Sequence, residues 1–150
     1  MRMTLSAWEA EGLLRKEEPS PEEIKGFLRK ADECIRDAQA GQTPHGQFTA
    51  VYGAARFLCT VVLRAAGYRV ASAEGHHEMT FRALPHVMGD AQLGRSRAYD
   101  AYRRRRSALE YQPVPTATET EASKFLADVQ RFRGEVELWL RQHHPALVAD

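Results

Sequence analysis

Cysteine is scarce in this 150-residue chain, and its two cysteines, Cys34 and Cys59, show no CxxC or CxxxH spacing. Both lie in apolar stretches with a helical pattern, which predicts reduced thiols in a core and argues against a disulfide framework. The sequence also has no Gly-rich phosphate loop, no GxSxG elbow and no Cys/His nucleophile pattern. The enzyme classes that depend on those motifs are therefore not indicated.

Net charge and long apolar runs are lacking as well. The chain has 21 Lys and Arg against 20 Asp and Glu, which argues against a generally basic coat for nucleic acid and against a polybasic membrane binder. Residues 1–14 carry acids where a signal peptide has its apolar core, and no stretch approaches eighteen uninterrupted apolar residues. We therefore expect a cytoplasmic protein that does not bind membranes, in which any electrostatic recognition is local.

Helical periodicity runs through almost the whole sequence. Residues 20–41 begin with Ser20 as N-cap and Pro21 at the first helical position, keep apolar residues on one face, and end at Gly41. Residues 43–67 are apolar almost all round, which is typical of the central helix of a bundle. No segment shows a convincing two-residue period, so no strand is predicted.

Three more helices are predicted after these two. Residues 75–89 predict a short helix that Pro85 either kinks or closes. Residues 96–111 predict a third long helix, which the prolines of "YQPVPT" end. Residues 118–143 predict the fourth long helix, with one apolar stripe.

These elements predict one all-α domain over the whole chain. Its body, residues 20–145, is expected to be an up-and-down four-helix bundle with the short extra helix between the second and third long helices. Residues 1–19 are expected to be an N-terminal extension with a short helix, in which Trp8 either anchors the extension or lies at a partner surface.

Four consecutive arginines lie near the end of the third long helix. Helical geometry points Arg103 and Arg104 away from the apolar sector, as solvated charges. Arg105 and Arg106 lie about 40° from that sector, so their stems can pack while their guanidinium groups present a fork to phosphate, carboxylate or an aromatic ring. The alternative for Arg106 is a simple ion pair with Glu110, four residues later.

The order of the helices and the motif "RSALEY", which begins at Arg106, resemble the HEPN superfamily. Domains of that family are four-helix bundles with an Arg-polar-x-x-x-His motif near the end of the third long helix, and the resemblance covers residues 20–145. It implies a homodimer in which Arg106 and Ser107 line a cleft between two protomers and act on RNA. Tyr111 stands where ribonucleases of the family have histidine. Because Arg106 and Tyr111 are about 140° apart on a helix, they could meet only if the helix unwinds or if two chains contribute.

The tyrosine changes the expected chemistry. Metal-free RNA cleavage needs a proton acceptor and donor with a pKa near the working pH, which histidine supplies and tyrosine does not. We therefore expect a HEPN-like protein that binds RNA or a nucleotide through Arg103, Arg105 and Arg106. Arg106, Ser107 and Tyr111 are the candidate catalytic residues, but binding is favoured over turnover. The resemblance also implies a prokaryotic toxin–antitoxin or defence system, with a nucleotidyltransferase-type partner protein.

Two other functions stay open. One is a non-catalytic interaction or dimerisation module, in which Arg106 is only an ion-pair partner. The other is a metal-dependent helical-bundle enzyme that uses His76, His77 or His86. Glu74-x-x-His77 has the spacing of half a ferritin-like motif, but no second half occurs, and we expect neither a metal nor a cofactor. The segment with His76 and His77 could instead border the cleft and supply a general base.

Overall fold

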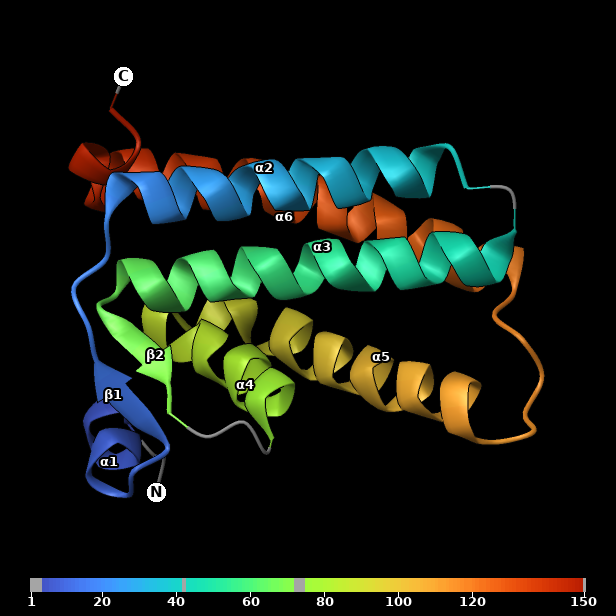
Figure 1. Cartoon of the computed structure of the whole chain (residues 1–150), viewed down its shortest axis with the longest axis horizontal. Helices are drawn as coiled ribbons and strands as arrows, with labels where there is room; N and C mark the ends of the chain where they lie inside the picture. The colour runs from blue at the N-terminus through green and yellow to red at the C-terminus, as the bar shows by residue number, and fades with distance from the viewer. Residues whose placement is uncertain (1–3, 42, 72–74, 150) are drawn as a thin grey trace.

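The computed structural model of the chain describes residues 4–41, 43–71 and 75–149, which are mostly helical (Figure 1). The predicted all-α character is confirmed. The long helices are α2 (Pro21–Gln39), α3 (Pro44–Ala65), α5 (Leu93–Tyr111) and α6 (Glu119–His143). The shorter elements are α1 (Leu5–Ala10), α4 (His76–Met88) and the 3-10 turns η1 (Asp90–Gln92) and η2 (Pro145–Leu147).

A small sheet ties the N-terminal extension to the segment after α3. Strand β1 (Leu14–Lys16) pairs antiparallel with β2 (Tyr68–Val70), with Leu14 opposite Val70. The prediction that the chain has no strand is therefore wrong, because strands of three residues are too short for a two-residue period to show in a sequence. Trp8 is buried in a small cluster with Leu14, which confirms that it anchors the extension.

Capping residues set the helix boundaries close to the predicted ones. The hydroxyl of Ser20 accepts the backbone N–H of Glu23 at 3.1 Å at the start of α2. Thr118 and Glu121 form a capping box at the start of α6. Helix α4 continues past Pro85 to Met88, so this proline does not close the helix.

Helix α3 is the element on which the others pack. In the view of Figure 1, α2 lies above it and α4 and α5 lie below it, while α6 contacts it from behind. This surrounding explains why its sequence is apolar almost all round. By length and composition α3 could also cross a membrane, but 67% of its most apolar window is buried in this fold, as in the core helix of a globular domain.

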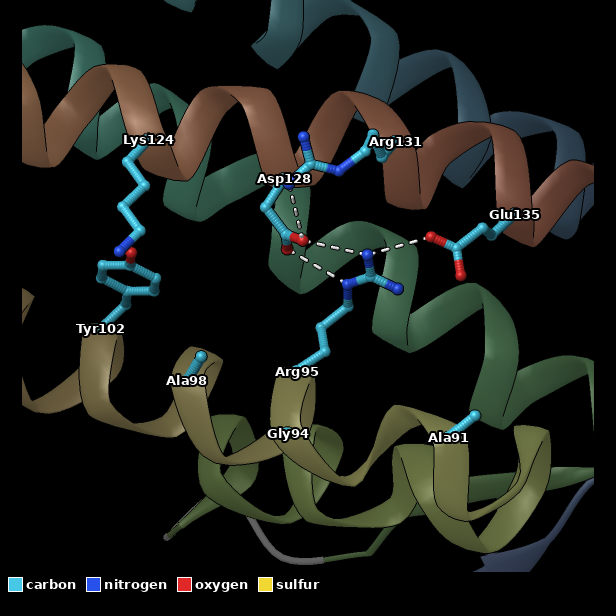
Figure 2. Close-up of a pocket in the computed structure, with 9 residues that line it drawn as sticks. All are labelled: Ala91, Gly94, Arg95, Ala98, Tyr102, Lys124, Asp128, Arg131 and Glu135. Carbon is cyan, nitrogen blue, oxygen red and sulfur yellow. Dashed lines mark hydrogen bonds and ion pairs between the residues drawn. The ribbon is translucent and has the colours of Figure 1, made fainter.

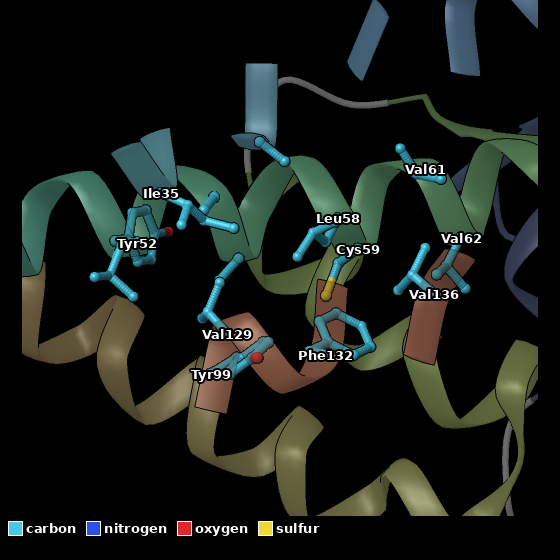
Figure 3. Packing of buried hydrophobic residues seen from close by; sticks show 14 of the residues in the cluster. Ile35, Tyr52, Leu58, Cys59, Val61, Val62, Tyr99, Val129, Phe132 and Val136 are labelled. Carbon is cyan, nitrogen blue, oxygen red and sulfur yellow. The ribbon is translucent and has the colours of Figure 1, made fainter. Parts of the chain in front are cut away.

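Aliphatic and aromatic side chains fill the space between α3, α5 and α6 (Figure 3). The ring of Tyr99 on α5 lies 5.9, 5.8 and 5.7 Å from the rings of Phe81, Phe125 and Phe132, measured between centres. The buried hydroxyl of Tyr99 donates to Oδ2 of Asp128 at 2.8 Å, which satisfies its polar end. Side chains of α5 therefore reach α6 across the core.

A buried arginine joins the N-terminal extension to the helices. Arg64 on α3 is only 2% exposed, and its guanidinium contacts Oε1 of Glu23 at 2.9 Å. It also donates to the backbone carbonyls of Glu17 at 2.9 Å and Tyr68 at 3.0 Å. Arg69 adds contacts to Glu17 and Glu23 at 2.6 and 2.9 Å. One guanidinium thus holds three segments of the chain together.

Replacing Arg64 by methionine should lower the free energy of unfolding by about 2–3 kcal/mol, because the change leaves the carbonyls of Glu17 and Tyr68 without this donor and Glu23 with Arg69 alone. Urea denaturation followed by circular dichroism measures this. Arg15→Met on β1 is the control, since the Arg15 side chain is 62% exposed, and it should cost less than about 1 kcal/mol. Equal effects of the two substitutions would contradict a special role for Arg64.

Candidate functional site

Basic side chains from three helices meet around one buried tyrosine. Tyr52 lies on α3, and its neighbours come from α3, from the first turn of α4 and from α5. We call this set the basic cluster; its members are Tyr52, Arg56, His76, His77, Arg103 and Arg106.

Tyr52 connects two of these elements directly. Its side chain is almost fully buried, and its hydroxyl lies 2.9 Å from Nδ1 of His77. The guanidinium carbon of Arg106 lies 5.1 Å from the centre of the Tyr52 ring, which is cation–π distance. Arg106 and His77 therefore both contact Tyr52. His77 lies on α4, outside the motif "RSALEY" that begins at Arg106.

Burial keeps both partners of this hydrogen bond neutral. It raises the pKa of Tyr52 to about 12, although the positive charge of Arg106 opposes the shift. Burial lowers the pKa of His77 to about 4, and the positive charge of Arg56 acts in the same direction. At neutral pH both groups are therefore uncharged, and the tautomer of His77 sets the direction of the bond: either the tyrosine O–H donates to Nδ1, or Nδ1–H donates to the tyrosine oxygen.

Arg103 and Arg104 share the carboxylate of Asp100. Nε of Arg103 lies 2.7 Å from Oδ1 of Asp100, and Arg104 binds the other oxygen. The Arg103 side chain is 29% exposed, with Glu78 4.0 Å away, so the prediction of a solvated charge is wrong for this residue. It holds for Arg104, which is 63% exposed.

Arg105 holds the connection to α6. Its guanidinium donates to both carboxylate oxygens of Glu121 at 2.8 and 3.2 Å and to the backbone carbonyls of Pro115 and Thr116 at 3.2 and 3.4 Å. The hydrogen bond to Glu121 raises the pKa of Arg105. This predicted nucleic-acid ligand is thus engaged with the chain itself.

The remaining motif residues do not meet Arg106 within one chain. Helix α5 stays helical through Tyr111, whose side chain is 78% exposed at the end of the helix, and Ser107 is exposed as well. Arg106 forms the predicted ion pair with Glu110, but the distance is 3.8 Å and both side chains are more than a third exposed. The structure joins Arg106 to Tyr52 and not to Tyr111.

The histidines do not form a metal centre. Among the described residues, no group of three or more His, Cys, Asp or Glu is placed to hold a metal ion. The rings of His76 and His77 lie 6.1 Å apart, whereas His86 packs against Trp8 with ring centres 4.6 Å apart. Glu74, the other half of the Glu-x-x-His spacing, lies outside the described residues.

A groove of about 440 Å³ lies between α5 and α6 (Figure 2). Arg95 crosses it and contacts Asp128 at 3.0 Å and Glu135 at 2.9 Å. Burial alone would raise the pKa of Asp128, but the hydrogen bonds from Arg95 and Tyr99 hold it below its ordinary value. These charges satisfy one another and bridge the two helices, so we do not take the groove as the functional site.

Comparison with known proteins assigns no family. No family model matches the chain, and neither a curated protein nor a solved structure matches it.

The lowered pKa of His77 predicts a loss of stability in acid. Its pKa is about 4 in the folded chain and 6.5 ordinarily, so protons bind the unfolded chain more tightly between these values. The free energy of unfolding should fall as the pH falls through that window. His77→Gln should make this fall smaller, which urea denaturation at a series of pH values measures.

The control is His45→Gln, at an exposed position in the first turn of α3. It should leave the pH dependence of stability unchanged. If His77→Gln and the unchanged protein gave the same pH profile, His77 would not be the neutral, partly buried group described above.

Proposed function

We propose that the protein is a HEPN-like domain, an up-and-down bundle of α2, α3, α5 and α6, that binds single-stranded RNA through the basic cluster. The observation that carries the proposal is the position of Arg106 over the ring of Tyr52, with His77 bonded to the same tyrosine. The short helix α4 before α5 agrees with the helix order of that family. A homodimer is the expected assembly, since it is the arrangement that could bring Tyr111 of a second chain towards Arg106.

Phosphate recognition is the chemistry that Arg106 offers. Its guanidinium is held over the ring of Tyr52, and its fork of N–H donors suits the oxygens of a phosphodiester. An exposed ion pair four residues apart on a helix is worth only about 0.3–0.5 kcal/mol. A phosphate can therefore replace Glu110 as the partner of Arg106 at little cost, whereas Arg105 would have to give up four hydrogen bonds.

Binding without cleavage follows from the proton affinities in the cluster. Attack by a ribose 2′-hydroxyl needs a base with a pKa near the working pH. With a pKa of about 4, His77 is a weak base, and with a pKa of about 12 Tyr52 keeps its proton. Neither group is suited to move a proton at neutral pH.

Arg106→Ala should weaken the binding of a short fluorescent single-stranded RNA by about tenfold or more, because a hydrogen bond to a charged group is worth about 1.5–3 kcal/mol. Fluorescence anisotropy measures the affinity, and the dependence of affinity on salt should decrease by about one phosphate contact. Thermal denaturation checks that the fold is retained.

Arg141→Ala is the matched control. Arg141 also forms an exposed ion pair on a helix, 3.8 Å from Glu137, and its loss removes the same charge far along α6. It should leave RNA affinity within about twofold. If the unchanged protein cleaved the RNA and Arg106→Ala did not, the protein would be a ribonuclease, and the proposal of binding without cleavage would be wrong. Equal binding by both variants would contradict the proposal and favour an interaction module in which Arg106 pairs only with Glu110.

A further inference from the structure

An aromatic pair on neighbouring helices lies beside the basic cluster. The rings of Phe27 on α2 and Phe57 on α3 stack with their centres 6.1 Å apart and an angle of 27° between their planes. Nζ of Lys30 lies 5.8 and 5.7 Å from the two ring centres. The guanidinium carbon of Arg56 lies over the Phe57 ring at 4.4 Å from its centre. Both phenylalanines are partly exposed.

Arg56 belongs to this aromatic layer and to the basic cluster at the same time. It follows Tyr52 by one turn of α3, so the two side chains lie on the same side of the helix. Its positive charge also acts on the pKa values of Tyr52, His76 and His77. The phosphate-binding part of the surface and the aromatic part therefore adjoin.

The guanidinium of Arg56 differs from those of the other arginines nearby. Arg103 and Arg105 each bind a carboxylate at less than 3 Å, and Arg106 has Glu110 at 3.8 Å. The ion pairs found among residues 4–41, 43–71 and 75–149 do not include Arg56. A planar cation that packs on an aromatic ring and has no acidic partner there is a surface on which a nucleobase can stack.

We infer that an unpaired nucleobase stacks on the guanidinium plane of Arg56, backed by Phe57, while a phosphate of the same strand binds Arg106. This stacking step rests on the RNA binding proposed above and specifies the ligand: a single strand whose bases are free. A double-stranded RNA offers phosphates but no open base face, so it lacks the second contact.

The test compares two labelled strands with the same number of phosphates, one of oligoadenylate and one in which every base is removed from the ribose. Fluorescence anisotropy should show that the unchanged protein binds the base-bearing strand about tenfold more tightly, since stacking is worth about 1–3 kcal/mol per base. Arg56→Lys keeps the charge but lacks the plane. Arg56→Lys should bind both strands as weakly as the unchanged protein binds the abasic strand.

The control is Arg104→Lys, at a side chain that is 63% exposed and bound only to Asp100 among the described residues. It should keep the preference for bases. A 2-aminopurine in the strand adds a direct readout, because its transfer from the neighbouring adenines to Arg56 should raise its fluorescence in the unchanged protein and not in Arg56→Lys. Competition by adenosine monophosphate, but not by inorganic phosphate, would support stacking and show that one nucleotide suffices.

The failure of this inference can be separated from failure of the proposed function. Equal affinity of the unchanged protein for the two strands would overturn the stacking step and leave phosphate binding intact. Absence of binding to either strand would overturn both. Arg106→Ala should weaken binding to the two strands by the same factor, and a selective loss for the base-bearing strand would show that Arg106, and not Arg56, carries the base contact.

Discussion

Burial of α3 on nearly every side is the constraint from which the arrangement of the molecule follows. Because this helix is apolar almost all round, α2, α4 and α6 each bury a face against it, and α5 reaches it as well. Helices α5 and α6 then face each other across a groove, which Arg95 and Asp128 bridge through their side chains. The basic cluster lies where α3, α4 and α5 come together, so its geometry depends on the same packing.

Two kinds of arginine can be distinguished by their partners. Arg64, Arg95 and Arg105 bind carboxylates at about 3 Å or less together with further acceptors, and each joins segments distant in sequence. Removing such a group would leave buried or partly buried acceptors unpaired. Arg106 has a weak partner, and Arg56 packs on an aromatic ring. Arginines that stabilise the fold are thus distinct from those available to an anionic ligand.

Local signals in the sequence predicted the helices well, whereas long-range contacts were out of reach. Ser20 was recognised as a cap because its partner lies three residues away, and residue 118 was predicted as the start of the last helix, where the structure places a capping box. The motif singled out Arg106, and the segment with His77 was considered as its neighbour, but nothing in the spacing indicated Tyr52, which only packing brings under Arg106. Arg105 was predicted to bind nucleic acid, but its actual partner is Glu121. The sequence could not indicate this contact, because Glu121 lies beyond a turn whose path the sequence does not reveal. The two strands were missed because they are short.

The hydrogen bonds of Arg64 have a consequence at the other end of the same helix. They pin the last turn of α3 to the N-terminal extension and to β2, while the side-chain amide of Gln47 in the first turn donates to the carbonyl of Ala38 at the end of α2. Tyr52 and Arg56 therefore lie on a helix that hydrogen bonds hold in place at both ends. Such a support is preorganised: in the proposed complex, the backbone of α3 would have little freedom to lose, and the entropy cost on this helix would fall mainly on the side chain of Arg56.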